Sequence, residues 1–504
     1  MSGGKETRLP GDSRGRILFL KVLFISVFAV IAGRLVQVQV FESERYRADA
    51  RRQYEDKLEI RATRGAILDR EGRPLVSTAT VASVAADPRM LGANADPLAR
   101  HLAGILREPL ALIKKKLSAR GTNFVWIARR VDPAVAAKID RKRFPGVIVT
   151  EDPKRVYHYD DLAGQLLGFT DLDCRGISGL ELQFDASLRG ADGYEIRMRD
   201  GLGRAKPALE YPRVEAVDGE DLVLTIDLDY QAIAEEALRR GVEESEAESG
   251  LVVMMDPGSG EILAMANYPR LHPARAGTVE RGVTRNRAVT DMFEPGSVFK
   301  IVTASAAIEH GLVRPSDTFF AENGSYRVPL PRGKFRTITD THEYGTITFR
   351  EAVEVSSNIV MAKVSDRVGA EMLYRSARDF GFGTETGVEL PGEIRGELKK
   401  PTDWSGTTLN TMSYGYEVGV TPLQIAAAYC VIANGGTLYR PTIVLRHQGN
   451  DTRRKPPQAI RRVVSQETAT TLNTFFVGVV ERGTGVGARV EGVSIAGKTG
   501  TARK

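Results

Sequence analysis

A serine and a lysine that could act together stand three residues apart in the string EPGSVFK, residues 294–300. A serine hydroxyl becomes a good nucleophile at neutral pH only when a base beside it takes its proton, and an amine can be that base. A proline and a glycine break the chain before an apolar stretch, so the pattern predicts a helix that begins near Ser297 and carries Ser297 and Lys300 on one face. Alone it is weak evidence, because Ser2 and Lys5 repeat the spacing by chance and a serine here can simply cap a helix.

Two more polar strings interrupt apolar stretches later in the chain. The string SSN, residues 356–358, lies inside a helical pattern beside buried positions, where each unpaired polar side chain would cost about 1–3 kcal/mol. The string GKTGT, residues 497–501, predicts a strand that carries a cation and two hydroxyls, and a glycine in a strand often marks the close approach of a ligand. Taken singly, the first string is explained as well by helix capping and the second by a polar edge strand.

The three strings S-x-x-K, S-x-N and K-T-G, in this order, form the set carried by penicillin-recognising serine enzymes, with Ser357 in the place of an aspartate. With them, the chain resembles a class B penicillin-binding protein, the monofunctional transpeptidase kind used in division or sporulation septum synthesis. Further matches extend the resemblance over nearly the whole chain: Arg64-Gly65, Asp69-Arg70 and Gly72; Gly168-Phe169-Thr170; Gly179-Leu180-Glu181 with Leu188 and Gly190; and Thr421-Pro422-Leu423-Gln424.

The resemblance implies a serine-type D-Ala-D-Ala transpeptidase that forms peptidoglycan cross-links through an acyl-enzyme. Ser297 would attack the penultimate D-Ala carbonyl of a stem peptide and expel the terminal D-Ala, and an amine from a neighbouring stem would resolve the ester. Lys300 would be the base, which requires burial and a neighbouring cation, Lys498, to lower its pKa from about 10.4. Beta-lactams mimic the D-Ala-D-Ala end and would acylate Ser297.

The same resemblance assigns the rest of the site. Ser356 would relay the proton to the leaving amine, and Asn358 would hold both Lys300 and the substrate amide. The backbone N–H groups of Ser297 and Thr501 would form the oxyanion hole. The terminal carboxylate would be bound by the third string, Lys498, Thr499, Gly500 and Thr501. No metal or cofactor is implied.

The elements that must position these strings have an α+β pattern. Residues 61–78 predict a strand, a turn and a strand; residues 222–244 predict a strand followed by a helix; and residues 251–269 predict two apolar strands joined by a turn. This order predicts an antiparallel sheet with helices packed on it, on both faces in the family, and a main domain boundary near residues 217–221.

The N-terminus predicts a membrane anchor. Residues 17–40 are largely apolar and follow a basic leader, residues 1–16. Lys21 and Arg34 interrupt the run, and residues 22–33 fall short of the roughly 20 residues that a bilayer needs, so a cleaved signal peptide is the alternative. No A-x-A cleavage site follows, and the family's helix is uncleaved. Basic residues on both sides of the run do not fix its orientation; the resemblance implies a single pass through the inner (plasma) membrane, a cytoplasmic N-terminus and an extracytoplasmic catalytic domain.

The resemblance divides the rest of the chain into an elongated, β-rich, non-catalytic dimerisation or pedestal domain, residues 41–220, and a transpeptidase domain, residues 221–504. The family's sheet continues past K-T-G with further strands and a closing helix. We therefore expect the second domain to be incomplete at Lys504, and a protein that ends there to fold poorly or to resist acylation. Stoichiometric labelling of the 504-residue protein by a fluorescent penicillin would contradict this expectation.

Composition and charge limit the classes of partner that the sequence supports. With 70 basic and 64 acidic residues, the formal charge of +6 gives no sign of nucleic-acid binding. Cys174 and Cys430 stand far apart and form neither a disulfide framework nor a metal motif. The expected partners are stem peptides that end in D-Ala-D-Ala, beta-lactams, the inner membrane, a septal glycosyltransferase and other divisome proteins.

Two alternatives remain open from the residues. The first is a catalytically inert, truncated divisome scaffold, which penicillin labelling of Ser297 would distinguish from the enzyme. The second is a D,D-carboxypeptidase or beta-lactamase, in which water takes the acyl group and Glu417 or Asp340 would be the deacylating carboxylate. The large N-terminal module argues against the second, and a penicillin-sensing receptor would need more membrane spans than this sequence predicts.

Overall fold

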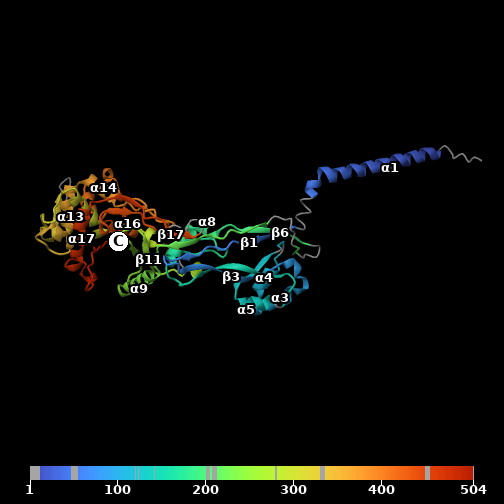
Figure 1. Ribbon diagram of the computed structural model, residues 1–504, viewed down its shortest axis with the longest axis horizontal. Coiled ribbons are helices and arrows are strands. Elements are labelled where there is room, and N and C mark those ends of the chain that lie inside the picture. The colour runs from blue at the N-terminus through green and yellow to red at the C-terminus, as the bar shows by residue number, and fades with distance from the viewer. Residues whose placement is uncertain are drawn as a thin grey trace, which may run out of the picture. The chain divides into compact units, whose positions relative to one another are not determined.

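Two units make up the chain: residues 1–62 with 191–217, and residues 63–190 with 218–504. The computed structural model describes residues 12–46, 55–119, 121–122, 124–140, 142, 144–199, 205–206, 213–278, 281–329, 335–448 and 454–502. Figure 1 labels helices and strands of both units.

The first unit contains the apolar N-terminal helix. Helix α1 (Asp12–Val36) passes into a π-helical turn, η1 (Gln37–Phe41), and both are drawn in blue in Figure 1. Together, Gly15–Phe41 form a helix long and apolar enough to span a bilayer. Its large side chains are uncovered, with Phe24 65% exposed, and an apolar surface of this kind needs lipid or protein to cover it. The predicted anchor, residues 17–40, lies within this continuous helical segment.

A small antiparallel sheet belongs to the same unit. Strand β6 (Gly193–Arg199) pairs with β1 (Glu55–Ile60) and, further along, with β7 (Ala205–Lys206) and β8 (Arg213–Val214). Ile60 lies opposite Gly193 in the β1–β6 register, so the sheet joins segments more than a hundred residues apart in sequence.

The second unit contains a six-stranded mixed sheet. Its central path runs β17-β9-β2-β3-β4, and β5 pairs with β3. The predicted strand, turn and strand of residues 61–78 are confirmed, because β2 and β3 are antiparallel and Ile67 lies opposite Val76. The strands are β2 (Ile67–Leu68), β3 (Pro74–Ala86), β4 (Val125–Val131), β5 (Val147–Tyr157), β9 (Asp221–Leu224) and β17 (Val444–Gln448). This sheet therefore contains strands from both sides of the predicted boundary near residue 220.

Three helices cover the β3–β5 portion of this sheet, as Figure 1 shows: α3 (Ala95–Leu106), α4 (Leu110–Leu117) and α5 (Pro133–Asp140). Leu98 and Leu102 of α3 recur at the four-residue spacing of one helix face and are fully buried with Ile113 of α4. This core is separate from the clusters that surround the three polar strings.

A buried ionic cluster fixes the chain near the start of this unit. Glu181 in α7 (Gly179–Gln183) is completely buried and accepts hydrogen bonds from Arg64 Nε and Arg155 Nε, each at 2.8 Å. Arg64 also donates to Asp185 at 2.7 Å, at the first residue of α8 (Asp185–Arg189). Arg64 and Glu181, two residues of the family resemblance, therefore have a structural role, because they pair buried charges that would otherwise be costly.

We expect the substitution Glu181→Ala to lower the free energy of unfolding by about 3–5 kcal/mol, because it removes the buried carboxylate with which both Arg64 and Arg155 are paired. Thermal unfolding of the purified protein, followed by circular dichroism, measures this. The matched control is Asp96→Ala, which removes an exposed ion pair with Lys114 (2.8 Å) and should leave the unfolding midpoint unchanged. Equal midpoints for the two variants would contradict the structural role of the cluster.

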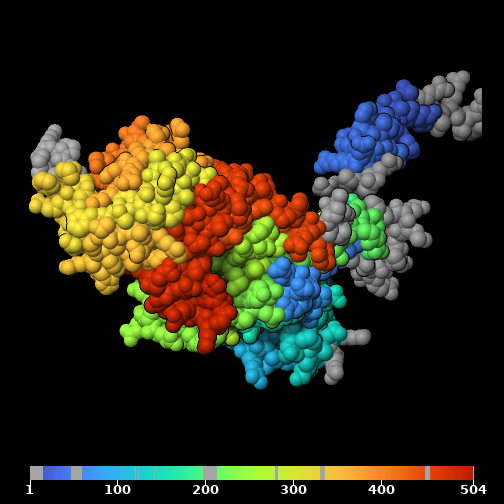
Figure 2. Space-filling model, turned by 60° about the vertical axis from the view of Figure 1, so that its left-hand side comes forward, coloured from blue at the N-terminus to red at the C-terminus, as the bar shows by residue number. Residues whose placement is uncertain are grey.

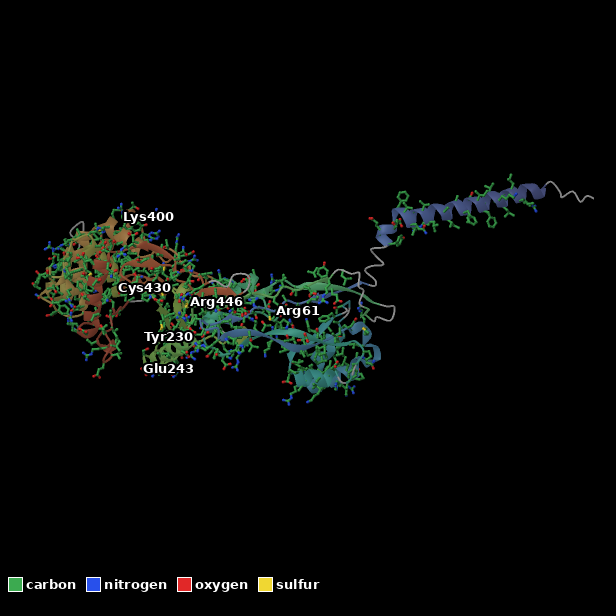
Figure 3. All side chains as sticks on the ribbon, viewed as in Figure 1. Arg61, Tyr230, Glu243, Lys400, Cys430 and Arg446 are labelled. Atoms are coloured by element: carbon green, nitrogen blue, oxygen red, sulfur yellow. The ribbon has the colours of Figure 1, made fainter. Side chains whose placement is uncertain are left out.

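The strand, helix and hairpin predicted from residues 222–269 are present. After β9, Asp227 caps α9 (Leu228–Glu244), and β10 (Gly250–Met255) pairs antiparallel with β11 (Ile262–Tyr268). Ala264 and Ala266 pack under α9, while Met265 faces the opposite side, so helices cover both faces of the hairpin. The outer face of α9 carries the exposed Tyr230 and Glu243, labelled in Figure 3.

A helical core built around five fully buried phenylalanines holds the polar strings. The aromatic side chains are Phe299, Phe349, Phe380, Phe382 and Phe475. They come from or lie beside the helices α11 (Lys300–Glu309), α12 (Phe349–Glu354), α13 (Asn358–Val368), α14 (Ala370–Asp379), α16 (Pro422–Ala433) and α17 (Gln466–Glu481). In Figure 2 the red surface of the C-terminal segment borders yellow surface that comes from a much earlier part of the chain.

Shorter elements complete this unit. The two-stranded pairs are β12 (Thr318–Phe320) with β15 (Thr346–Thr348), β13 (Ser325–Pro329) with β14 (Phe335–Thr339), and β16 (Thr437–Tyr439) with β18 (Ala459–Arg462). The short helices are α6 (Gly164–Leu167), α10 (Arg287–Thr290) and α15 (Thr408–Met412), and the 3-10 turns are η2 (Pro88–Met90), η3 (Gly92–Asn94), η4 (Pro273–Thr278), η5 (Arg281–Thr284), η6 (Gly296–Phe299), η7 (Glu322–Gly324), η9 (Pro401–Asp403) and η10 (Val486–Ala488).

Candidate active site

Ser297 lies in a tight turn directly before a helix, close to where the sequence predicts a helix start. The turn is 3-10 (η6), and the α-helix α11 begins at Lys300. Gly296 has a φ of +55°, and a Cβ there would lie 2.5 Å from the carbonyl oxygen of Thr501, so only glycine permits this approach. Ser297 is half-buried, and its hydroxyl makes no hydrogen bond to any residue that the structure describes.

Lys300 is buried to 1% exposure and points its amine at the second polar string. Its Nζ donates to the carbonyl oxygen of Ser356 at 2.5 Å and lies 3.1 Å from the Ser356 hydroxyl. Burial lowers the pKa of Lys300 well below its usual value, the charge of Lys498 lowers it further, and Asp340 opposes both effects. The environment therefore favours the neutral amine, the form that can accept a proton.

Ser356 joins the amines of two lysines that are nearly 200 residues apart in sequence. It lies between α12 and α13 in the left-handed conformation, with φ +62°. Its Oγ accepts hydrogen bonds from Lys498 at 2.8 Å and from Lys300 at 3.1 Å. Both lone pairs of the hydroxyl are then used, so its own O–H is free to donate to a third group.

The third string, residues 497–501, is placed beside the Ser297 turn, but the prediction that it forms a strand is wrong. A strand needs a neighbour to pair with, and residues 494–502 form no ladder within the described chain; the N–H of Gly497 instead donates to Phe476 O at 3.0 Å in α17. A Cβ on Gly500 would lie 2.8 Å from the Val298 side chain, so this segment is packed tightly against η6.

Within this segment, Lys498 and Thr499 have defined partners. Besides Ser356, the Lys498 amine donates to Thr499 O at 3.0 Å, and partial burial lowers its pKa to about 8. The Thr499 hydroxyl lies 2.6 Å from that of Thr484. Gly500 and Thr501 are exposed, so their main-chain groups are accessible to a ligand.

Ser357 and Asn358 form the start of α13. Ser357 is the N-cap, and its hydroxyl accepts from Val360 N at 3.1 Å while it donates to Asp340 at 2.5 Å. The resemblance leads us to expect a hydrogen bond between Asn358 and Lys300, but the structure does not contain it. The Asn358 side-chain nitrogen instead donates to Thr339 O at 2.9 Å. Within this string, Ser357 caps the helix, as the capping alternative predicts, and Ser356 contacts both lysines.

The two carboxylates considered for hydrolysis are held by other groups. Asp340 accepts from the Ser357 hydroxyl and from two backbone N–H groups of α13. Glu417 accepts from the Thr408 and Thr411 hydroxyls at 2.6 and 2.7 Å. Sequence reasoning named Asp340 only as a possible deacylating group and missed its contacts with the second string; no local pattern signals them, because they join residues 17 to 19 positions apart.

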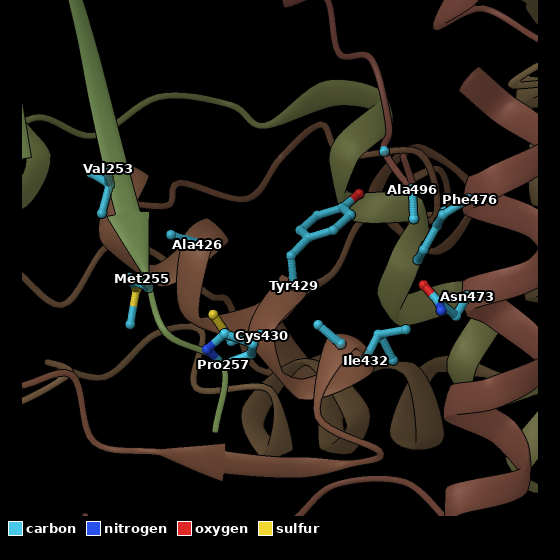
Figure 4. A pocket seen from close by; sticks show the side chains of 12 residues that line it. Val253, Met255, Pro257, Ala426, Tyr429, Cys430, Ile432, Asn473, Phe476 and Ala496 are labelled. Atoms are coloured by element: carbon cyan, nitrogen blue, oxygen red, sulfur yellow. The ribbon is translucent and has the colours of Figure 1, made fainter. Parts of the chain in front are cut away.

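An apolar groove of about 310 Å³ lies next to the third string (Figure 4). Val253 and Met255 of β10 line one part of the groove, and Ala496 and Gly497 line another. Helices α16 and α17 contribute Tyr429 and Phe476. Tyr429 links the groove to the Ser297 turn, because its hydroxyl donates to Val298 O at 2.9 Å.

Known protein families and proteins resemble this chain over most of its length. Residues 250–504 match the family described as penicillin binding protein transpeptidase domain, and residues 59–224 match the penicillin-binding protein dimerisation domain. Peptidoglycan D,D-transpeptidase FtsI of Escherichia coli is 31% identical over 97% of this chain and 81% of its own length. Stage V sporulation protein D of Bacillus subtilis is 32% identical over 97% of this chain and 76% of its own length.

A solved structure has the same fold. The crystal structure of penicillin-binding protein 3 from Mycobacterium tuberculosis, complexed with ampicillin, has a TM-score of 0.67 and 30% identity, and the match covers 89% of this chain and 82% of that one. Two family matches in the expected order, relatives that align over nearly the whole chain, and this fold lead to one assignment. The chain belongs to the class B penicillin-binding proteins.

Proposed function

We propose that the protein is a peptidoglycan D,D-transpeptidase that works through an acyl-enzyme on Ser297 and is inhibited covalently by beta-lactams. The observation that carries the proposal is the meeting of three distant segments: the Ser297 turn packs against residues 500–501, and the amines of Lys300 and Lys498 converge on the Ser356 hydroxyl. Serine acyl transfer requires a nucleophile, a base that is neutral at working pH, and cations for an anionic substrate.

In the proposed reaction, the Ser297 Oγ attacks the penultimate D-Ala carbonyl carbon and its proton passes to the neutral amine of Lys300. The bond to the terminal D-Ala nitrogen breaks, and that nitrogen takes a proton through the Ser356 hydroxyl, whose O–H is free to donate. An amine of a second stem peptide then attacks the ester, forms the cross-link and returns the proton to Ser297. Asn358 would orient the substrate amide.

The third string is proposed to bind the substrate carboxylate, through Lys498, Thr499, Gly500 and Thr501. Its support is that the Lys498 cation is partly buried and that the exposed main chain of 500–501 lies beside Ser297. The N–H groups of Ser297 and Thr501 are proposed as the oxyanion hole, since both belong to the two backbone segments that meet at Gly296.

The domain division at about residue 220 is also proposed. Its support is that the two family matches cover residues 59–224 and 250–504. The relatives named above extend beyond the matched region, which covers 81% and 76% of their lengths.

The membrane helix indicates an anchored protein, and we propose that its N-terminus is cytoplasmic and its catalytic domain extracytoplasmic, where peptidoglycan is built. A septal glycosyltransferase and other divisome proteins are the proposed partners, by analogy with the relatives named for division and sporulation.

The test uses the full-length protein in detergent with benzylpenicillin, followed by intact mass and peptide mapping. Because the three polar strings meet in the described chain, we expect one acyl group per chain, on the peptide that carries Ser297. This result would contradict the expectation from the sequence that a protein ending at Lys504 resists acylation. A D-Ala-D-Ala stem peptide should release D-Ala, and an added amine acceptor should divert the acyl group from water into a cross-linked product. A protein that acquires no adduct, or an adduct on another serine, overturns the proposal; an adduct that only water resolves would make the protein a hydrolase.

A further inference from the structure

Asp340 connects a surface hairpin to the start of α13. It follows β14 directly, and its Oδ1 accepts from the N–H groups of Asn358 and Ile359 at 2.6 and 3.1 Å. Its Oδ2 accepts from the Ser357 hydroxyl at 2.5 Å. One residue earlier, Thr339 O accepts from the Asn358 side chain at 2.9 Å, so four hydrogen bonds join two consecutive residues of the hairpin to one turn of helix.

These bonds fix the residues that follow Ser356 immediately. Ser356 is not glycine, yet it has a φ of +62°, a conformation that costs a residue with a side chain about 1–3 kcal/mol unless its surroundings enforce it. A carboxylate at a helix N-terminus, with two N–H donors and a hydroxyl donor, is a strong restraint of this kind. If α13 began one residue earlier or later, the Ser356 hydroxyl would leave Lys300 and Lys498.

We propose that Asp340 is a positioning residue for acyl transfer: it clamps the first turn of α13 and thereby keeps the Ser356 hydroxyl within reach of both lysines. The inference rests on the proposed function. Asp340 acts through Ser356 and Ser357 and does not itself touch the nucleophile.

The negative charge of the Asp340 carboxylate also affects the pKa of Lys300. Among the described residues, two charged groups face Lys300 from other elements. Burial lowers the pKa of Lys300, Lys498 on the terminal segment lowers it further, and Asp340 partly offsets both effects. On its own helix, the acidic Glu309 lies at the far end of α11. His342 and Glu343 follow Asp340 in the same turn. Removal of the Asp340 charge should therefore make the Lys300 amine still less basic.

The test compares the acylation rate by benzylpenicillin between pH 5 and 9 for the full-length wild type, Asp340→Asn and Asp340→Ala. Asp340→Asn keeps the size of the side chain and an oxygen that can accept from Asn358 and Ile359, so it is the variant expected to fold. We expect an acylation rate about tenfold lower for Asp340→Asn, and up to about 100-fold lower for Asp340→Ala, because small misplacements of a reacting group have effects of this size.

The pH dependence of the acylation rate distinguishes a positioning role of Asp340 from a role in stability alone. In Asp340→Asn the acid limb should move to lower pH, by on the order of one unit, because the charge that favours protonated Lys300 is gone. The matched control is Thr348→Ala, which removes the capping box of α12 and should lower thermal stability without moving the pH profile.

Each possible outcome supports or refutes a stated part of the proposal. Asp340 variants that lose only thermal stability, with rates and pH profile equal to the wild type below the unfolding temperature, overturn the proposal. Variants that are slow but keep the wild-type acid limb support the clamp and refute the contribution of charge. A wild type that benzylpenicillin does not acylate overturns the proposed function, and this inference with it.

Discussion

Replacement of Ser297 by alanine is expected to abolish the benzylpenicillin adduct completely while the protein stays folded. Ser297 is half-buried and its hydroxyl has no hydrogen-bond partner among the described residues, so the substitution removes a nucleophile without breaking an internal bond. Intact-mass spectrometry after exposure to benzylpenicillin measures the adduct, and circular dichroism confirms the fold. Release of D-Ala from a stem peptide should disappear together with the adduct.

The matched control is Ser305, in the helix that follows the Ser297 turn. Ser305 of α11 is 1% exposed, and its hydroxyl also lacks a hydrogen-bond partner within the described chain. Ser305→Ala therefore removes a serine hydroxyl from the helix that follows the Ser297 turn and should leave the adduct unchanged. Persistence of a stoichiometric adduct in Ser297→Ala would reject the assignment of the nucleophile, and its loss in both variants would point to a damaged helix.

The elements that could be predicted from the sequence are those whose signal is local. The hairpin of residues 251–269 and the strand and helix of residues 222–244 are confirmed, because alternation, helical spacing and a turn-forming DPGSG string all lie within the segments themselves. The Ser297 turn was placed by the same means, since a proline and a glycine mark the break before α11.

Features that depend on residues far away in sequence could not be predicted. The left-handed conformation of Ser356 is stabilised by its neighbours' bonds to Asp340, and nothing in the SSN string signals it. The predicted strand at residues 497–501 failed for the related reason that a strand exists only with a partner. Order along the chain led to the correct family, but the roles of individual side chains depend on contacts that only the folded chain displays.

The convergence on Ser356 explains why two lysines are present where acyl transfer needs one base. Two ammonium groups so close together would repel each other, and Lys300, the more deeply buried, is the one whose charged form is least stable. Lys498 is partly accessible and its pKa is lowered only to about 8, so near neutral pH it remains largely protonated. The pair can thus divide the work: a neutral base and a cation for the substrate carboxylate.

This division predicts a bell-shaped pH dependence of acylation and a specific response to Lys300→Met. As the pH falls through the lowered pKa of Lys300, its amine becomes protonated and the rate should drop; as the pH rises above about 8, Lys498 loses its charge and the rate should drop again. Lys300→Met removes the base but keeps the length of the side chain. The acylation rate by benzylpenicillin should fall by about 10²–10⁴-fold, and the acid limb should vanish while the limb near pH 8 persists.

The control for this variant is Lys363→Met in α13, which removes a lysine of similar exposure to Lys498 whose amine is paired with Glu322 at 2.6 Å. It should change the acylation rate little and leave both limbs in place. A Lys300→Met protein that keeps the acid limb would show that another group is the base. A protein that loses both limbs would mean that Lys300 and Lys498 titrate as one coupled pair and not as separate base and anchor.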